Sequence, residues 1–591
     1  MAGAEGNGVE ERNWPNLAAM FFDQAARHGK KPFLWAKRDG AYQPIDWTET
    51  ATRVSDLARG LRALGVKRGD RVALVSENRP EWAIADLAIM SAGAITVPAY
   101  TTHTTDDHRY LLDNCGATAV IVSTAELAER VLPAADQVDS VQYLIAMERP
   151  EHHHVSRIAV FTVDETVARG REAGGDVAAW VAELDRDDLA CLIYTSGTGG
   201  SPKGVMTSHG NILANCHGAY ILLETLGLGD EVFLNFLPLS HSYEHTAGLM
   251  FPISIAATIY FAEGADTLPA NMIEARPTIM TAVPRLYEAM HQRILRGIER
   301  EGGIKARLFF MALRLGEKRL ANPKGLGPID WLMDRVLDRL VRDKFRARFG
   351  GRLKAMVSGG APLNPRIGLF FMALGLRLLQ GYGQTEASPV VCANPPTRIK
   401  IATVGPPLDG VAVKIAEDGE ILVRGAQVMK GYWGDPETSA RTVVDGWLHT
   451  GDVGEIDADG YLLITDRKKD FIKNSGGDMI APARVEGFLT LEPEIAQAMV
   501  YGDKRPYLVA VIVPGKEIAE RPEAELRKAV SAAVGRVNEG LPAVERVRRF
   551  MLAPEPFTTD NGQMTPTLKI RRHAIRQVHG VALEALYEGK S

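Results

Sequence analysis

Apolar residues recur with two alternating periods along the first quarter of the chain. Runs at helical spacing predict helices, and the short, continuously apolar runs between them predict buried strands. The predicted helices cover 48–64, 80–92 and 106–114, and the predicted strands cover 71–76, 95–97 and 119–122. Strands that alternate with helices of this length form βαβ units around a largely parallel sheet. The pattern therefore predicts an α/β fold, with this part of the chain serving as scaffold.

Further short apolar runs predict strands along the rest of the chain. They cover 189–193, 353–357, 376–379, 420–425 and 461–465. A dense charge run follows at 466–470, and beyond it lie predicted strands over 498–501 and 507–513 and a predicted helix over 523–537. These last elements suffice for a small α+β domain.

Residues 284–349 contain more basic than acidic residues, with apolar residues between them at helical spacing. One interpretation is a solvated helical hairpin that caps the domain. The other is a basic amphipathic helix pair that lies on an anionic membrane surface. The second interpretation predicts that neutralising Arg335, Arg339 and Arg342 weakens binding to anionic vesicles.

Composition and charge narrow the class of protein. The chain has 591 residues, 46% hydrophobic and 24% charged, which indicates a globular protein. This length suggests roughly three or four structural units. The net charge of −5 argues against a protein that wraps nucleic acid, so no nucleic-acid partner is expected.

Four cysteines without CxxC spacing are expected to be reduced thiols.

The longest apolar run, 249–262, contains Pro252 and is shorter than the roughly 18 residues of a membrane span. Residues 1–14 lack the features of a secretory signal, so we expect a soluble, cytoplasmic protein. The region 149–188 is polar and rich in glycine and alanine. Its three consecutive histidines, 152–154, are expected in a solvated loop because neighbouring side chains diverge.

The strand at 189–193 opens into a loop rich in glycines and hydroxyl groups. The loop reads Tyr194-Thr195-Ser196-Gly197-Thr198-Gly199-Gly200-Ser201-Pro202-Lys203-Gly204. Glycines let backbone N–H groups turn toward an anion, hydroxyl groups add donors, and Lys203 adds a mobile positive charge. Such a loop suits a polyphosphate. It differs from the common nucleotide P-loop because Gly204, and not Ser or Thr, follows the lysine.

Two more strands end in turns of small residues, at 358–362 and 381–386. Such turns at the carboxyl edge of a sheet are where α/β folds bind ligands. In the second turn, Tyr382 offers a flat face for a base and Thr385 a hydroxyl group for a phosphate. Glu386 offers a hard carboxylate oxygen for Mg²⁺. Further on, Asp452 follows a glycine in a turn, where its carboxylate suits two vicinal ribose hydroxyl groups.

His241 and His245 are four residues apart, which on a helix is a metal-like spacing. Pro238 and the apolar run that follows favour a strand-to-loop transition instead. The apolar stretch 246–261 fits two interpretations equally, a substrate tunnel and ordinary core.

The ordered motifs TSGTGGSPKG, GYGQTE, WLHTGD and DRKKD resemble those of the adenylate-forming superfamily, which includes acyl- and aryl-CoA synthetases and nonribosomal-peptide adenylation domains. The resemblance covers nearly the whole chain, although Gly199 stands where the family usually has a second threonine. It implies nucleotide binding by Thr195, Ser196, Gly197, Thr198, Gly199, Gly360, Ala361, Tyr382, Asp452 and Arg467. It implies catalytic roles for Lys203, Thr385, Glu386 and Lys569, and a metal site at Glu386 and Thr198.

The resemblance also implies the domain organisation. It predicts a large N-terminal domain with several βαβ subdomains over 1–466 and a small, mobile α+β domain over 467–591. Lys469 matches the family's pivot between them, Gly476 and Gly477 match the loop that lines the CoA channel, and His241 matches a residue of the acyl pocket.

The implied activity is ATP-dependent conversion of a carboxylic acid to an acyl adenylate and then, with CoA, to acyl-CoA, AMP and pyrophosphate. ATP, Mg²⁺ and CoA are the implied cofactors and cosubstrates. The basic insertion resembles those of long-chain fatty acyl-CoA synthetases, so a long-chain acid is the expected substrate. An aryl or medium-chain acid, and a carrier protein in place of CoA, remain as alternatives. Membrane contact and a homodimer are left open.

Overall fold

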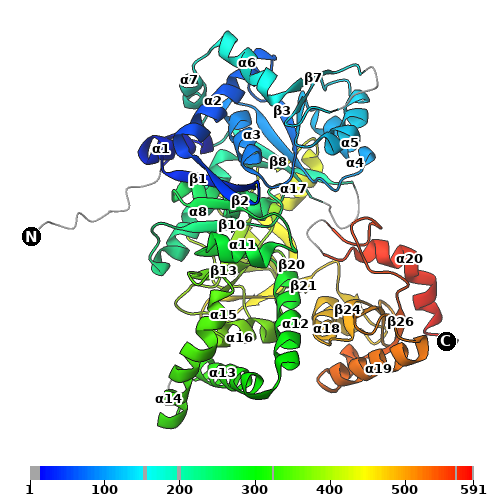
Figure 1. The fold of residues 1–591 in the computed structure, drawn as a ribbon. Helices are drawn as coiled ribbons and strands as arrows, with labels where there is room; N and C mark the ends of the chain where they lie inside the picture. The colour runs from blue at the N-terminus through cyan, green and yellow to red at the C-terminus, as the bar shows by residue number, and fades with distance from the viewer. Residues whose placement is uncertain (1–12, 151–155, 196–200, 323–324, 566–568, 589–591) are drawn as a thin grey trace, which may run out of the picture.

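The computed structural model describes residues 13–150, 156–195, 201–322, 325–565 and 569–588. Figure 1 shows a large domain, coloured blue to yellow, beside a small domain, coloured orange to red. The large domain is built from β-sheets covered by helices, and the small one is α+β. The predicted α/β class, with a large N-terminal and a small C-terminal domain, is confirmed.

Two eight-stranded sheets form the frame of the large domain. The first contains, in spatial order, β15 (Val390–Ala393), β14 (Leu378–Gly383), β13 (Ala355–Ser358), β12 (Ile279–Ala282), β10 (Val232–Asn235), β11 (Thr258–Phe261), β1 (Pro32–Arg38) and β2 (Ala41–Asp46). Its inner neighbours are parallel, and an antiparallel strand closes each edge. A parallel centre needs helices on both faces, because both faces must be buried.

The second sheet has the same kind of parallel centre. In spatial order it contains β18 (Gly431–Tyr432), β9 (Lys203–Ser208), β8 (Leu189–Thr195), β4 (Ile95–Ala99), β3 (Arg71–Val75), β5 (Ala119–Val122), β6 (Tyr143–Ala146) and β7 (Ala159–Thr162). Strands β8 and β9 are antiparallel, so that Thr195 and Lys203 face each other at the mouth of the glycine-rich loop.

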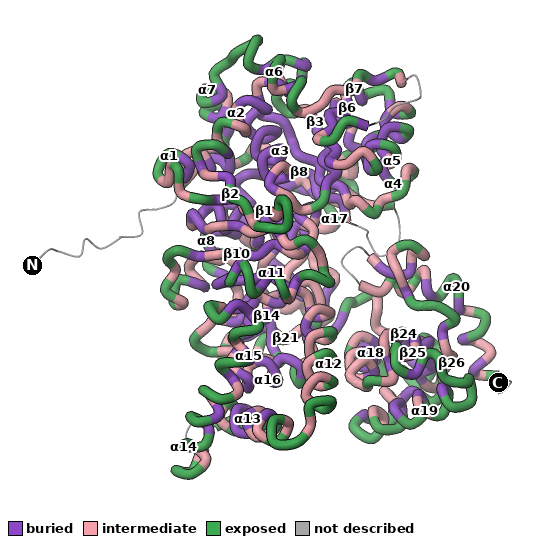
Figure 2. The backbone as a smooth tube through the Cα atoms, viewed as in Figure 1, coloured by how far each residue is buried: buried purple, intermediate pink, exposed green. Residues whose placement is uncertain are grey.

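Helices fill the space between the two sheets and cover their outer faces. They are α1 (Leu17–His28), α2 (Trp47–Ala63), α3 (Pro80–Ser91), α4 (Thr105–Cys115), α5 (Ala125–Asp136), α6 (Val163–Ala173), α7 (Val177–Ala182), α8 (His209–Leu223), α9 (Ser242–Glu244), α10 (Phe251–Ser254) and α11 (Leu268–Ala275). The central core joins β1, β3, β8 and β10 through α1, α2, α3 and α8. Helices α4 and α5 cover the outer face of the second sheet, and α11 lies on that of the first. Figure 2 shows the resulting buried interior.

Local sequence explains where these helices begin and end. The Asp46 side chain accepts a hydrogen bond from the Glu49 amide and so caps the start of α2. Thr104 and Asp107 form a reciprocal capping box at the start of α4, which ends at Gly116 in the left-handed conformation. The helices and strands predicted for residues 48–122 lie within two residues of the observed ones.

A smaller five-stranded sheet completes the β-structure of the large domain. It contains β16 (Ala412–Ile415), β17 (Glu420–Arg424), β20 (Trp447–Ile456), β19 (Val443–Val444) and β21 (Leu462–Arg467), with α17 (Pro436–Thr442) beside it. Strand β21 pairs with β20 and leads toward the small domain.

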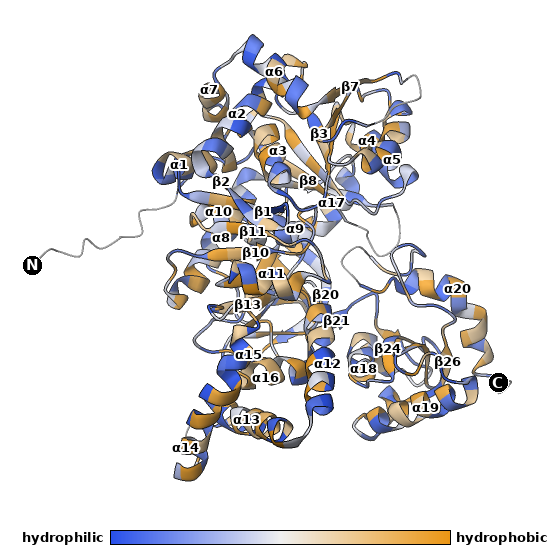
Figure 3. Ribbon diagram, in the orientation of Figure 1, coloured by the Kyte–Doolittle hydropathy of each residue, from blue (hydrophilic) through white to orange (hydrophobic). Residues whose placement is uncertain are grey.

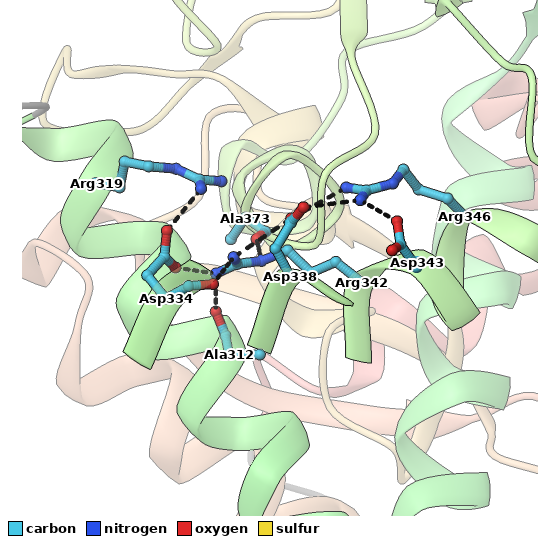
Figure 4. A network of polar contacts seen from close by, with 8 residues as sticks. All are labelled: Ala312, Arg319, Asp334, Asp338, Arg342, Asp343, Arg346 and Ala373. Carbon is cyan, nitrogen blue, oxygen red and sulfur yellow. Dashed lines mark hydrogen bonds and ion pairs between the residues drawn. The ribbon is translucent and has the colours of Figure 1, made fainter. Parts of the chain in front are cut away.

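A helical extension lies at the lower end of the large domain in Figure 1. It contains α12 (Pro284–Glu301), α13 (Gly303–Ala321), α14 (Pro328–Leu337), a π-helical turn (Asp338–Arg342), α15 (Asp343–Ala347) and α16 (Pro365–Ala373). Figure 4 shows the polar network inside it, centred on Arg342. Among the described residues no helix is long and apolar enough to cross a membrane.

The small domain packs helices on a three-stranded sheet. Its elements are β22 (Ile472–Lys473), β23 (Met479–Ile480), α18 (Pro482–Leu489), β24 (Ile495–Tyr501), β25 (Leu508–Pro514), α19 (Glu523–Glu539), β26 (Val547–Leu552) and α20 (Arg572–Ala585). It contacts the helical extension through hydrogen bonds from Arg285 to the Ala496 carbonyl (3.0 Å) and from Asn364 to the Gly487 carbonyl (3.1 Å).

The region 149–188, for which no helix or strand is predicted, holds β7, α6 and α7, and its histidines at 152–154 lie outside the described residues. Two expectations from the sequence are wrong. The segment after Pro238 is helical from Ser242 to Ser254, not a strand-to-loop transition. Arg342 is fully buried, so it cannot contact a vesicle as predicted.

Candidate active site

Strands β13 and β14 are parallel neighbours, so the turns that follow them lie at the same edge of the first sheet. After β13, Gly360 adopts a φ of 82°, a conformation that favours glycine and turns the backbone tightly before Ala361. At the end of β14, a Cβ on Gly383 would lie 1.9 Å from the Pro389 carbonyl oxygen. Both glycines are therefore required by the backbone geometry of this edge.

Tyr382, Asp452 and Arg467 come together beside this edge. The Tyr382 hydroxyl donates to Asp452 Oδ2 at 2.5 Å, and Arg467 Nε lies 3.4 Å from Asp452 Oδ1. Asp452 and Arg467 are cross-strand partners of β20 and β21, which fixes this approach. Burial raises the pKa of Asp452, and the Arg467 charge and the Tyr382 hydrogen bond oppose the rise.

Lys569 of the small domain reaches the same place. Its charge acts on both Asp452 and His241, which lie on separate elements of the large domain. Burial, reinforced by Arg467, lowers the pKa of Lys569 to about 8, and Asp452 opposes the shift. Burial and Lys569 together lower the pKa of His241 to about 3, so this imidazole is neutral. Its Nδ1 accepts a hydrogen bond from the Tyr243 amide.

A second polar cluster links the glycine-rich loop to Glu386. The Tyr432 hydroxyl donates to Glu386 Oε1 at 2.9 Å, and the Tyr432 ring lies 5.3 Å from Lys203 Nζ. Lys203 Nζ also lies 3.0 Å from Asp435 Oδ2 and donates to Thr438 Oγ1 at 2.9 Å. Burial raises the pKa of Glu386, although Tyr432 and Arg467 oppose the shift. In this structure Lys203 is thus held by α17.

Thr385 is buried, and its hydroxyl lies 3.0 Å from the Ser242 hydroxyl at the start of α9. This contact joins the turn after β14 to the segment that carries His241. Thr195 ends β8 opposite Lys203. The predicted nucleotide contacts Ser196, Gly197, Thr198 and Gly199 lie outside the described residues, so the predicted metal ligand Thr198 does too.

The predicted hinge and channel residues lie in the small domain's first segment. Lys469 is exposed in a turn in which the amides of Asp470 and Phe471 donate to the Arg467 carbonyl. Gly476 and Gly477 are exposed between β22 and β23, and Gly477 has a φ of 92°. Within the described ranges no hydrogen bond joins either glycine to Asp452, Tyr382 or Arg467.

Sequence reasoning missed Tyr432, Asp435 and Ser242. The Asp435–Pro436 pair is a helix-start signal, and Asp435 indeed caps α17 through the Thr438 amide. That signal does not reveal the contact with Lys203, which depends on the pairing of β18 with β9. Among the described residues, no group of three or more His, Cys, Asp or Glu side chains is placed to hold a metal ion.

Comparison with known proteins identifies this arrangement. The AMP-binding enzyme family matches residues 21–433, and the AMP-binding enzyme C-terminal domain matches residues 469–591. The chain belongs to the AMP-binding enzyme family. It is 34% identical to a long-chain-fatty-acid–CoA ligase of Mycobacterium bovis, over 97% of each chain. It is 31% identical to a peroxisomal long chain acyl-CoA synthetase of Arabidopsis thaliana, over 93% of this chain and 82% of the relative.

A solved structure agrees with this assignment. The adenylation domain of a carboxylate reductase from Mycobacterium chelonae superposes with a TM-score of 0.78 at 26% identity, covering 98% of this chain and 92% of that one. The predicted adenylate-forming family is confirmed. This AMP-binding enzyme is an acid–thiol ligase that uses ATP and CoA.

Proposed function

We propose that this AMP-binding enzyme converts a long-chain fatty acid to its acyl adenylate and then to acyl-CoA. The observation that carries the chemistry is that Lys569, from the small domain, lies near enough to Asp452, Arg467 and His241 of the large domain for the charges to act on one another. The substrate class rests on the relatives named above. The apolar run after His241 does not support a tunnel, because residues 249–253 belong to the packed central core.

The first half-reaction needs charge neutralisation more than proton transfer. The fatty acid carboxylate is already a nucleophile, and it forms a bond to the ATP α-phosphorus as the bond to pyrophosphate breaks. Positive charge fixed near the reacting phosphate stabilises the transition state. Lys569 is the mobile domain's contribution to that charge. Neutral His241 beside it can line the acyl end of the site without adding a competing charge.

The nucleoside would lie against Tyr382 and Asp452. Asp452 has one carboxylate oxygen on the Tyr382 hydroxyl and the other near Arg467, which holds the carboxylate in one orientation for two ribose hydroxyl groups. We assign the turn with Gly360 and Ala361 to the base, and Thr385 to the α-phosphate.

Glu386 fits Mg²⁺ binding. One of its carboxylate oxygens accepts from Tyr432, and a cation bound to the carboxylate would take its other ligands from phosphates and water, as Mg²⁺ usually does. When bound, the ion would neutralise phosphate charge. The glycine-rich loop with Thr195 and Lys203 would bind the departing pyrophosphate, after Lys203 exchanges Asp435 for a phosphate oxygen.

For the second half-reaction we propose that the small domain, residues 467–591, rotates about Lys469. The rotation would withdraw Lys569 and bring the Gly476–Gly477 turn to the thioester channel. The exposed turn at Lys469 supports a hinge, since its side chain makes no hydrogen bond or ion pair with any described residue that would oppose rotation.

Replacing Lys469 by proline is expected to leave adenylation nearly unchanged and to abolish acyl transfer to CoA. Proline fixes φ and so would block the rotation, whereas adenylation would need none, because in this structure the charge of Lys569 already acts on Asp452 and His241. ATP–pyrophosphate exchange measures the first step, and thioester formation from supplied acyl-AMP measures the second. The matched control is Lys469→Ala, which leaves φ free to change. Lys504→Pro in the small domain would be a poor control, because Lys504 has a φ of 58°, which proline cannot adopt. A similar loss in both steps would contradict the hinge.

The substrate class is tested with a panel of acids in the exchange assay, with and without CoA. We expect kcat/KM to rise by about fourfold per added methylene, from burial of ~0.8 kcal/mol each, up to roughly C12–C18. A maximum at an aryl or short-chain acid would contradict the long-chain proposal. Acyl transfer to a carrier protein but not to CoA would favour the other alternative.

A further inference from the structure

Exposed apolar side chains are concentrated on the helical extension. In the described part of the chain, more than half of the large apolar side chains that face solvent lie between residues 304 and 340. Helix α14 and the π-helical turn after it carry most of them, and Figure 3 shows hydrophobic segments on α14 at the far tip of the molecule. Large exposed apolar patches of this kind mark interaction sites.

The side chains of α14 and of the π-helical turn after it divide into three sectors. The first faces the protein: Asp334 and Leu337 are buried, and Leu337 packs on Ala312 and Leu315 of α13. The second is an apolar row that faces solvent at helical spacing: Ile329, Leu332, Met333, Val336 and Leu340, with Ile329 80% and Leu332 60% exposed. An ordinary solvated helix would carry polar residues in this second sector.

The third sector is aromatic and basic, and it borders the apolar row. Trp331, Arg335 and Arg339 are spaced four residues apart and are exposed. The Arg335 guanidinium lies 4.4 Å from the centre of a Trp331 ring. Tryptophan and arginine beside an apolar row are typical of helices that lie in a membrane interface, where the rings and the charges reach the headgroups.

Each acidic residue of this segment is paired with a basic residue. Asp330 pairs with Lys318 (2.6 Å), Asp334 with Arg319 (2.7 Å) and Arg342 (2.6 Å), and Asp338 with Arg346 (3.0 Å). Figure 4 shows the last three of these carboxylate pairs on the inner side of the segment.

Arg335 and Arg339, by contrast, form no ion pair with any residue that the structure describes. The outer face of α14 is therefore apolar and positively charged, although the whole chain carries a net charge of −5. This positive charge complements an anionic surface.

We propose that this face, residues 329–340, docks the enzyme on an anionic lipid bilayer. The face is a projecting ridge at the tip of the extension, so a flat surface can meet it without touching the remainder of the large domain (Figure 1). Docking would place the enzyme where apolar acids accumulate. The proposed docking is inferred from the exposed face alone, so it does not depend on which acid the enzyme activates.

The test is co-sedimentation of the full chain with vesicles of phosphatidylcholine, or of an equal mixture of phosphatidylcholine and phosphatidylglycerol. We expect stronger binding to the anionic vesicles, weakened by salt. Arg335→Gln with Arg339→Gln should weaken anionic binding by about thirtyfold, at ~1 kcal/mol per charge near the surface. Ile329→Ser, Leu332→Ser and Val336→Ser together should abolish it.

Matched controls lie on the small domain. Val578 and Val581 are 61% and 89% exposed on α20, and their serine variants should bind vesicles as the wild type does. Lys516→Gln with Lys528→Gln removes two exposed charges elsewhere and should also have little effect. Unchanged thermal unfolding would show that the α14 variants are folded, as expected for exposed positions.

The proposal is overturned if the α14 variants bind vesicles as tightly as the controls, or if the wild type ignores anionic vesicles. It is also overturned, in favour of an interface between copies, if the wild type dimerises in solution without vesicle binding and the triple serine variant is monomeric. Because the assay reads binding, these outcomes are independent of which acid the enzyme activates.

Discussion

Replacing Lys569 by alanine is expected to slow acyl-adenylate formation by at least about 10²–10³-fold, as for loss of one fixed group that stabilises transition-state charge. Acyl transfer from supplied acyl-AMP to CoA should change little. The reason is that Lys569 acts from the small domain, and in this structure its charge lies in the field of Asp452, Arg467 and His241. Exchange of pyrophosphate into ATP measures the first step, and thioester formation measures the second.

The conservative variant Lys569→Arg provides the control. The comparison is between the pH dependence of kcat/KM for adenylation in this variant and in the wild type. The pKa of Lys569 is lowered to about 8 by burial and Arg467, so the free enzyme loses this charge as the pH rises through that value. For the wild type, kcat/KM for adenylation should therefore fall above about pH 8, since kcat/KM reports groups of the free enzyme. Arginine stays charged, so the fall should move to much higher pH. Equal loss of both half-reactions in Lys569→Ala would contradict the role in one step.

The sequence predicted those parts of the site in which chemistry and local pattern coincide. Tyr382, Thr385 and Glu386 follow a predicted strand directly, and the structure places all three at the edge of the first sheet. Lys569 was different, because nothing in its own neighbourhood points to Asp452 far back in the chain; only the family resemblance connected them.

Contacts set by strand pairing could not be predicted in the same way. Tyr432 reaches Glu386 because the two-residue strand β18 pairs with β9, and so short a strand leaves no periodic signal. The helices and strands of residues 48–122 were predictable because each has a cap or a continuous apolar run. The helical segment from Ser242 to Ser254 was not, because Pro252 lies inside it and its middle is a π-helix.

Arg342 illustrates how one irregular turn defeats periodicity. At regular helical spacing, a residue five positions after Leu337 points away from it, so Arg342 reads as a surface residue. The π-helical turn Asp338–Arg342 has more residues per turn, and Arg342 returns to the buried face. Its guanidinium then donates to the carbonyls of Ala373 (2.9 Å) and Ala312 (2.7 Å) and to Asp334 Oδ1 (2.6 Å).

Replacing Arg342 by leucine should therefore destabilise the helical extension by about 3–5 kcal/mol, as for removal of one partner of a buried ion pair. The change removes this donor from the carbonyl groups of Ala312, Asp334 and Ala373 and leaves the Asp334 carboxylate with Arg319 alone. Local stability can be measured by hydrogen exchange of the amides in α13 and α14. Protection there should fall by at least about 10²-fold, since 1.4 kcal/mol is a factor of ten.

Arg348→Leu is the matched control. Arg348 is exposed, and no ion pair joins it to another residue within the described ranges, so its loss should leave exchange in α13 and α14 nearly unchanged. Arg342→Lys should fall between the two, because it keeps the charge but replaces the planar fork that reaches four acceptors on α13, α14 and α16. Equal effects of Arg342→Leu and Arg348→Leu on hydrogen exchange in α13 and α14 would contradict this prediction. The buried hydrogen bonds of Arg342 would then not be what joins α14 to the large domain. The ridge at residues 329–340 would then need another support.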